Sequence, residues 1–264
     1  MRTIVIHSLG ELVDRVTPLE PDPTTGRRRD SGVYRGSFNA VNPLLTSLDR
    51  LGGVSPAHTK ADLEEHILRN YIRYSRPHVG NEPVNDWEQL VSAQHHGVPT
   101  RLLDWTYSPL VAAFFATRPS DDGTVGDRAV WRLDWKAVHE KFGFPSRSLL
   151  IRDLDELFGK EGHFTPWALM RRGAHRDFAC LLEPPSLDQR IVVQAAVFTL
   201  SSDKSGPFDA FLAAHGLDDA LTKYVIPGRE VGRVRDQLDL VAMDERRLFP
   251  DLDGVAAAIR RYYA

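Results

Sequence analysis

Cysteine is almost absent from this chain of 264 residues, since Cys180 is the only one. A single cysteine cannot form an intramolecular disulfide or build a thiolate metal cluster. Long apolar runs are missing too. No stretch approaches the roughly 20 apolar residues that span a bilayer, and the apolar run near the start is too short for a signal sequence. These absences predict a soluble, cytoplasmic protein that does not enter a membrane.

An excess of one charge is also missing. The chain has 33 Lys and Arg against 36 Asp and Glu, which gives a formal net charge of -3. A dedicated nucleic-acid binder usually carries a basic surface that follows the phosphates. The composition therefore gives no support to that class, although it leaves nucleic acid open as a partner.

Several catalytic signatures are absent as well. The chain has no glycine-rich phosphate loop, no serine elbow and no cysteine with an evident partner. ATP hydrolysis and serine or cysteine nucleophilic catalysis therefore lack their usual sequence supports. His95 and His96 are adjacent rather than four residues apart, so they cannot chelate a metal from one helical face. We expect no metal site.

The apolar patterns predict a single α+β domain over residues 1–264, with a mixed or antiparallel sheet and flanking helices. Alternating or β-branched runs indicate strands at residues 3–9, 33–38, 128–135, 190–200 and 221–227. Helical spacing indicates helices at residues 9–18, 60–74, 85–97, 108–117 and 255–263. Asp86 is the expected N-cap of the third helix. Residues 136–186 show no clear pattern.

The sequence VYRG at residues 33–36 places an arginine and a glycine at the end of an expected strand. Arg35 in that position suits bidentate capture of a phosphate or carboxylate, and Gly36 keeps the neighbouring backbone open. The alternative is a structural ion pair between Arg35 and an aspartate such as Asp104. The residues alone leave both interpretations open.

The polar side chains of residues 94–106, QHHGVPTRLLDWT, follow neither the helical nor the strand period. Gly97 and Pro99 interrupt both periods. We interpret them as a loop that joins two helices. Its dense polar groups need partners, so we expect Arg101 and Asp104 to share one cleft with Arg35. A charged Asp104 would then orient either guanidinium.

Three further residues are candidates for the same cleft. Trp105 would supply an apolar wall or a stacking face, although most tryptophans are core residues. His95 would carry a proton or donate a hydrogen bond near neutral pH, although a capping or solvent-facing histidine fits equally well. Gln194 interrupts the apolar strand expected at residues 190–200. Its amide must bond neighbouring backbone or face a ligand.

The chain resembles the FRG-domain family, named for its Phe/Tyr-Arg-Gly motif. The segments that carry the resemblance are VYRGSF, LLTSLDR, QHHGVPTRLLDWTYSPLVAAFFA, RIVVQAAVFTL and LFPDLDGVA, from about residue 4 to 259. His96 stands where the family often has an aromatic residue. The resemblance implies one domain and a bacterial or phage protein, with a role as a toxin or defence effector.

The YRG strand is also similar to the first motif of arginine-class mono-ADP-ribosyltransferases. This resemblance implies that Arg35 holds the phosphates of NAD. In those enzymes a later strand supplies a catalytic glutamate, where this chain offers Gln194. A glutamine can bond a ribose hydroxyl but cannot stabilise an oxocarbenium-like centre as a carboxylate does. Asp104 or Glu183 would then supply the missing charge.

The two resemblances together imply an NAD-binding, ADP-ribosyltransferase-like enzyme or a degraded relative. Its acceptor would be a protein or a nucleic acid, and an antitoxin would be a further partner. The expected catalytic residues are Arg35, His95, Asp104 and Gln194. The expected nucleotide-binding residues are Tyr34, Arg35, Gly36, Arg101 and Trp105. The alternatives are a non-catalytic nucleotide-sensing or protein-interaction module of a defence system and a toxin that acts on nucleic acid.

Overall fold

The computed structural model describes residues 1–52, 58–78, 85–119, 126–158, 177–186, 188–202 and 206–263. The strands are β1 (Arg2–Val5), β2 (Val33–Ser37), β3 (Leu103–Thr106), β4 (Arg128–Leu133), β5 (Ala179–Leu182), β6 (Ala196–Ser201) and β7 (Leu221–Ile226). The longer helices are α1 (Leu9–Val16), α3 (Lys60–Ser75), α4 (Asp86–His95), α5 (Pro109–Thr117), α6 (Trp135–Phe142), α7 (Ile151–Phe158), α10 (Phe208–Ala214), α11 (Val231–Leu240) and α13 (Leu252–Tyr262). Short helical turns are α2 (Ser47–Arg50), η1 (Arg76–His78), α9 (Gln189–Val193), η2 (Asp218–Ala220), η3 (Gly228–Glu230) and α12 (Glu245–Leu248).

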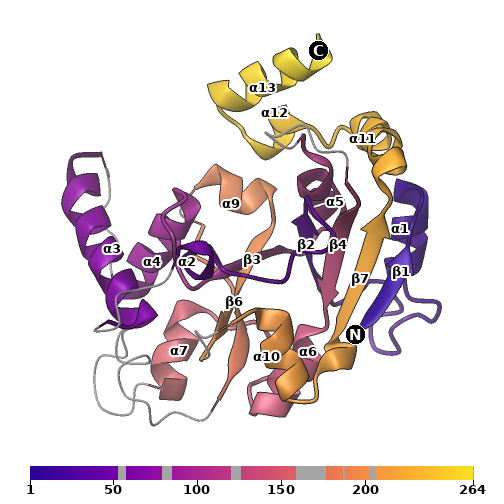
Figure 1. Ribbon diagram of the computed structural model, residues 1–264. Helices are drawn as coiled ribbons and strands as arrows, with labels where there is room; N and C mark the ends of the chain where they lie inside the picture. Colours follow the sequence, from indigo (N-terminus) through magenta and orange to yellow (C-terminus); the bar gives the residue numbers. More distant parts are fainter. Residues whose placement is uncertain are drawn as a thin grey trace.

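The strands form one sheet of seven, in the order β1-β7-β4-β2-β3-β6-β5. β1 pairs with β7 in parallel, and the other neighbouring pairs are antiparallel. The sheet is therefore mixed, and helices flank it (Figure 1). The predicted fold class, an α+β arrangement with a mixed sheet, is confirmed.

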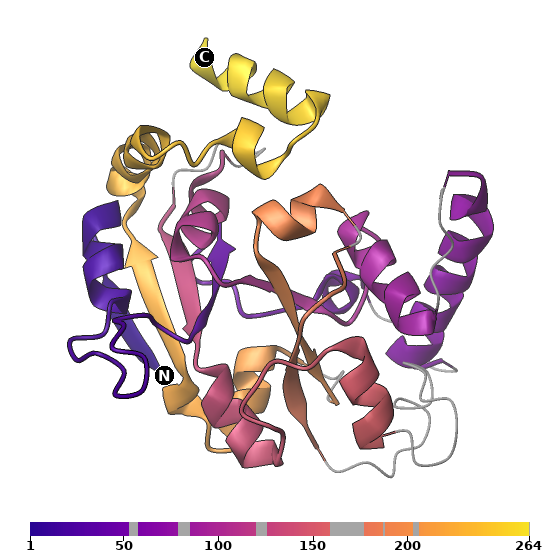
Figure 2. The same cartoon turned by 180° about the vertical axis from the view of Figure 1, so that it is seen from behind.

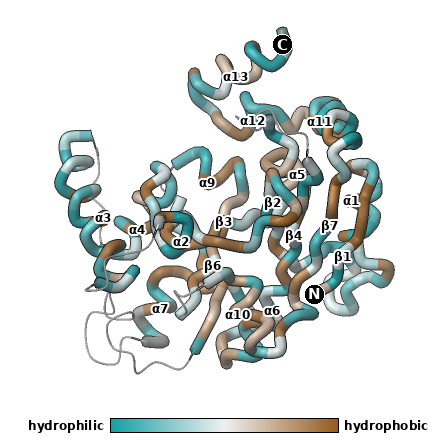
Figure 3. The backbone as a smooth tube through the Cα atoms, in the orientation of Figure 1, coloured by the Kyte–Doolittle hydropathy of each residue, from teal (hydrophilic) through white to brown (hydrophobic). Residues whose placement is uncertain are grey.

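Side chains alternate across the sheet because successive residues of a strand point to opposite faces. In β4, Ala129, Trp131 and Leu133 pack into one apolar cluster with α6 and α10, whereas Val130 packs into another with α1, α5 and α11. A third cluster joins α4 to β5 and β6. Figure 2 shows these helices from behind, and Figure 3 shows that α3 and α11 remain largely hydrophilic. The centre of the sheet is thus buried on both faces.

Two local predictions around residues 85–106 need correction. The helix α4 is capped by Asn85 rather than Asp86, since the Asn85 side chain accepts a hydrogen bond of 2.9 Å from the backbone N–H of Glu88. The segment 94–106 is a loop only in its middle part, because α4 extends to His95 and β3 covers Leu103–Thr106. Asp104 and Trp105 therefore lie on a strand and point to opposite faces.

The strand predicted at residues 190–200 is wrong in its first half. Residues Gln189–Val193 form α9, and β6 begins only at Ala196. Asp188 starts the helix, since its carboxylate accepts a hydrogen bond of 2.6 Å from the N–H of Arg190. Ala195 has a positive φ of 45°, which separates the helix from the strand. Gln194 is thus a helix C-cap and not a residue inside a strand.

The stretch that showed no clear pattern, residues 136–186, contributes α6, α7 and β5 in its described part. Buried His139 on α6 links this helix to β5. Its Nδ1 lies 2.8 Å from the carbonyl oxygen of Pro145, and its Nε2 accepts a hydrogen bond of 2.8 Å from the N–H of Leu181. Since a backbone N–H only donates, the proton of the neutral imidazole resides on Nδ1. Burial lowers the pKa of His139 below its usual value.

We expect His139 to make the stability depend on pH. The unfolded chain has an imidazole pKa near ~6.5, and the folded pKa is lower. The unfolded state therefore binds more protons as the pH falls through that range. The stabilisation is fully present above about pH 6.5 and declines below it. Urea unfolding between neutral and mildly acidic pH should show a smaller decline for His139→Gln than for wild type, and exposed His58→Gln should behave like wild type.

Candidate functional site

A cleft opens in the middle of the sheet because β2 and β3 pair at one position only. Tyr34 lies opposite Thr106, whereas β2 and β4 pair over five positions. Beyond Tyr34 the two strands diverge, and the space between them is a cavity of about 720 Å³. It is lined by Tyr34, Arg35, Gly36, Phe38, Asp104, Trp105, Thr106, Val111, Ala112, Phe115, Arg118, Pro119, Gln194 and Ala196.

Arg35 bridges the two strands where their pairing stops. Its Nη1 donates a hydrogen bond of 2.7 Å to the backbone oxygen of Asp104 and lies 3.4 Å from the Asp104 carboxylate. Burial lowers the pKa of the Arg35 guanidinium, and the charge of Asp104 opposes this shift. An arginine remains charged in either case. The predicted ion pair between Arg35 and Asp104 is present, and one edge of it faces the cleft.

Gln94 holds the other side of Asp104. Its Nε2 donates a hydrogen bond of 2.8 Å to Oδ1 of Asp104, and its Oε1 accepts one of 2.5 Å from the hydroxyl of Thr100. The carboxylate thus has a neutral donor on one oxygen and a cation near the other. Sequence reasoning placed Gln94 in the family pattern but not among the site residues. Its position on the last turn of α4, ahead of the polar loop, was the available signal.

Gly36 serves a different purpose from the one predicted. A Cβ on Gly36 would lie 2.2 Å from the backbone oxygen of Ala112 and 2.5 Å from the backbone nitrogen of Ala116. The glycine therefore lets β2 pack directly against α5. The backbone beside Arg35 is covered by this helix and not left open for a phosphate.

Tyr34 and Trp105 line the cleft, but their polar atoms are bonded inside the protein. The Tyr34 hydroxyl donates to Asp30, which also pairs with Arg132. The Trp105 indole is 2% exposed and donates a hydrogen bond of 3.0 Å to Thr199. Trp105 is thus a buried core residue, which was the alternative to a stacking face. Phe38 and Phe115, which sequence reasoning missed, contribute further aromatic side chains to the cleft.

Arg101 and His95 do not line this cleft. Arg101 is buried and forms an ion pair with Glu64 of α3, so the prediction of a shared cleft with Arg35 is wrong. Glu64 also accepts a hydrogen bond of 2.7 Å from the backbone N–H of Arg101. His95 lies 3.4 Å from Asp188, and desolvation lowers its pKa while Asp188 opposes the shift. Arg101 thus faces α3, and His95 faces the residue that begins α9.

Gln194 lines the cleft and Glu183 does not. The side-chain amide of Gln194 donates a hydrogen bond of 2.9 Å to the backbone oxygen of Leu248. Glu183 accepts hydrogen bonds of 2.6 Å from Tyr107 and 2.8 Å from Ser148. It therefore cannot supply the cleft with a carboxylate. Among the described lining residues, that group comes from Asp104.

Arg118 gives the cleft a second cation that sequence reasoning missed. It follows the last residue of α5, is exposed, and lies over the Phe249 ring with its guanidinium carbon 5.3 Å from the centroid. No carboxylate of the described residues forms an ion pair with it. A cation at a helix C-terminus is also favoured by the helix dipole, so its position by itself does not require a ligand.

Over the ranges that the structure describes, no three His, Cys, Asp or Glu side chains lie close enough together to hold a metal ion. Within the same ranges, no helix has the length and apolar character needed to cross a bilayer.

The sequence model of the FRG-domain family matches residues 30–124 of this chain. This segment is shorter than the expected range of 4–259, but it contains β2, β3, α5 and the Arg35–Asp104 pair. No curated protein and no solved structure gives a significant match, and the ADP-ribosyltransferase resemblance gains no support from these comparisons. The match supports the FRG family for the part of the chain that builds most of the cleft.

Proposed function

We propose that the cleft between β2 and β3 binds an anionic dinucleotide of the NAD class. The observation that carries this proposal is the presence of two guanidinium groups, Arg35 and Arg118, on one cavity of about 720 Å³. Guanidinium groups bind phosphates with paired hydrogen bonds. The volume lies within the usual range for small-molecule and cofactor sites.

The other lining residues suit the rest of such a ligand. Phe38, Val111 and Phe115 offer apolar surface on which a planar base can pack. Thr106 is less available, since its hydroxyl donates to the backbone oxygen of Gln194 at 2.6 Å. The Gln194 amide oxygen has no partner among the described residues and is placed to accept from a ribose hydroxyl.

The chemistry that we assign to this site is ADP-ribosyl transfer. In that reaction the bond between nicotinamide and ribose breaks, and the ribose carbon gains positive charge before an acceptor adds. Asp104 is the described carboxylate in the cleft that would stabilise this charge. Gln94 and Arg35 hold it in place. The acceptor would be a protein or a nucleic acid, and a role as a toxin or defence effector would fit an antitoxin partner.

A non-catalytic nucleotide sensor is the second candidate. One observation favours it: Asp104 is already bonded to both Arg35 and Gln94. A carboxylate that is already paired with an arginine stabilises a nearby positive charge less strongly. The same cleft would then bind the ligand without cleaving it.

Calorimetric titration of NAD and ADP-ribose tests the binding step at fixed ionic strength. We expect wild type to bind, and Arg118→Gln to lower the affinity about tenfold or more, since a charged hydrogen bond contributes ~1.5–3 kcal/mol. Arg35→Lys keeps the charge but loses the paired donors, so it should weaken binding as well. Arg229→Gln, an exposed arginine outside the cleft, is the control and should bind like wild type.

Incubation with NAD labelled in its nicotinamide ring separates the two candidates. Release of nicotinamide, abolished in Asp104→Asn, would support transfer, whereas binding without release would support the sensor. Folded wild type that binds neither NAD nor ADP-ribose at millimolar concentration would refute the proposal.

A further inference from the structure

The C-terminal part of the chain returns to the helix that carries much of the cleft. Residues 245–251, which comprise α12 and the three residues after it, form a segment that we call the C-terminal strap. Leu248 is fully buried in the apolar cluster that includes Val111 and Ala112 of α5, and Phe249 packs against the same cluster. Neither strap residue lines the cavity itself. The strap therefore supports α5 from outside the cleft.

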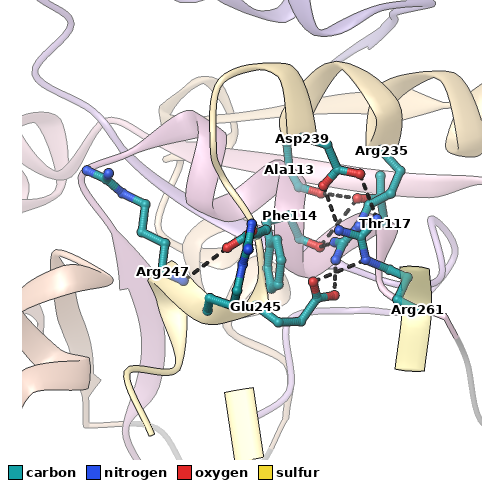
Figure 4. A network of polar contacts seen from close by, with 10 residues as sticks. Ala113, Phe114, Thr117, Arg235, Asp239, Glu245, Arg247 and Arg261 are labelled. Atoms are coloured by element: carbon teal, nitrogen blue, oxygen red, sulfur yellow. Dashed lines mark hydrogen bonds and ion pairs between the residues drawn. The ribbon is translucent and has the colours of Figure 1, made fainter. Parts of the chain in front are cut away.

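Charged groups at the start of the strap fasten it to α5 and α11. Buried Glu245 accepts hydrogen bonds from Arg235 of α11 and, at 3.1 Å, from Arg261 of α13 (Figure 4). Arg235 also donates a hydrogen bond of 3.2 Å to the backbone oxygen of Phe114 on α5. Arg261 donates hydrogen bonds of 2.7 and 2.6 Å to the two carboxylate oxygens of Asp239. The position of the strap is thus fixed by contacts that do not involve the cleft.

Phe249 of the strap contacts Arg118, one of the two cations of the cleft. The guanidinium carbon of Arg118 lies over the Phe249 ring, 5.3 Å from its centroid. A cation in this position is attracted by the face of the ring. The contact uses none of the five N–H donors of the guanidinium, and Arg118 donates no hydrogen bond to the described part of the chain. Phe249 therefore fixes the Arg118 side chain and leaves its donors free.

The strap fixes Gln194 in a comparable way. The Gln194 amide nitrogen donates to the backbone oxygen of Leu248 at 2.9 Å, which leaves the amide oxygen free to accept. Arg190 of α9 lies on the strap as well: its guanidinium carbon is 5.0 Å from the Phe249 centroid, and its Nη2 is 2.9 Å from the carboxylate of Asp251. The strap thus connects α5 and α9, which carry lining residues from two sides.

We propose that Phe249 is a positioning residue for ligand binding in the cleft and that it acts through Arg118. This inference rests on the proposed function, in which Arg118 binds a phosphate of a dinucleotide. A long side chain that is already fixed loses less conformational entropy when the ligand binds. The Phe249 ring supplies this fixation. The binding site accordingly includes a C-terminal segment that lies outside the matched residues 30–124.

Calorimetric titration of NAD and ADP-ribose into folded variants tests the proposal. Phe249→Leu keeps an apolar side chain but removes the ring face, so it should raise the Kd about fivefold, the scale expected for releasing one long side chain. Phe249→Tyr retains the ring and should restore the affinity to within about twofold of wild type. Phe142→Leu is the matched control, since Phe142 is also half-buried but stacks on Phe211 and does not line the cleft.

A double variant distinguishes positioning from packing. If the ring acts through Arg118, Phe249→Leu should cause no further loss of affinity in an Arg118→Gln background. An additive loss in the double variant would overturn the proposal, and so would a Phe249→Leu variant that binds as tightly as wild type or a Phe249→Tyr variant as weak as Phe249→Leu. These three outcomes leave the proposed function standing. Folded wild type that binds neither NAD nor ADP-ribose would refute the proposed function and this inference together.

Discussion

Glu64→Gln is expected to lower the free energy of unfolding by about 3–5 kcal/mol, the usual cost of breaking a buried ion pair. The side chains of Glu64 and Arg101 are 0% and 2% exposed. The amide keeps the shape of the carboxylate but removes its charge, so the Arg101 cation remains buried without compensation. The pair joins α3 to the segment that leads into β3. Its loss should therefore loosen both elements.

Chemical unfolding at neutral pH measures this effect. Two further variants separate the cost of the unpaired charge from the cost of changed packing. The double variant Glu64→Leu with Arg101→Met removes both charges, so it should be less destabilised than Glu64→Gln. Glu20→Gln makes the same chemical change at an exposed position and should stay within about 0.5 kcal/mol of wild type. Equal destabilisation in the single and double variants would show that packing, and not charge, determines the cost.

The Arg35–Asp104 pair shows what a sequence can predict about a site. Both residues stood out because a polar residue interrupts an apolar pattern, and their pairing was one of two stated alternatives. The partner of Arg101 could not be found in this way. Glu64 lies in a separate helix, 37 positions earlier, and local spacing carries no information about which helix folds over which strand. Long-range ion pairs depend on the packing of the whole chain.

The misassigned strand at residues 190–200 has a local cause. Ile191, Val192 and Val193 are β-branched, which favours a strand. Asp188, two residues before Arg190, favours a helix instead. Its carboxylate accepts a hydrogen bond from the backbone N–H of Arg190 and caps the first turn. The helix at the C-terminus shows the opposite situation. Its existence was predicted from periodicity, but the face that it turns to solvent follows only from its contacts with Glu245 and Asp239.

Gly36 is the position at which a single methyl group should have the largest effect on both stability and the cleft. Gly36→Ala is expected to lower the free energy of unfolding by about 3 kcal/mol or more, at the upper end for overpacking. The new Cβ would lie 2.2 and 2.5 Å from backbone atoms of Ala112 and Ala116. Backbone atoms cannot rotate away as a flexible side chain does. The strand β2 and the helix α5 must therefore move apart.

This movement should also change ligand binding, because β2 carries Arg35 and α5 ends just before Arg118. A weaker affinity for NAD in the folded fraction of Gly36→Ala would therefore accompany the lower stability. Gly10→Ala is the matched control: Gly10 lies inside α1, and its nearest neighbour to a Cβ is 3.8 Å away. Because Gly10 lies in the first turn of that helix, this change should leave the free energy of unfolding unchanged or raise it by less than about 1 kcal/mol. Thermal and urea unfolding of both variants measure the contrast, and an unchanged melting temperature for Gly36→Ala would mean that β2 and α5 are not in direct backbone contact.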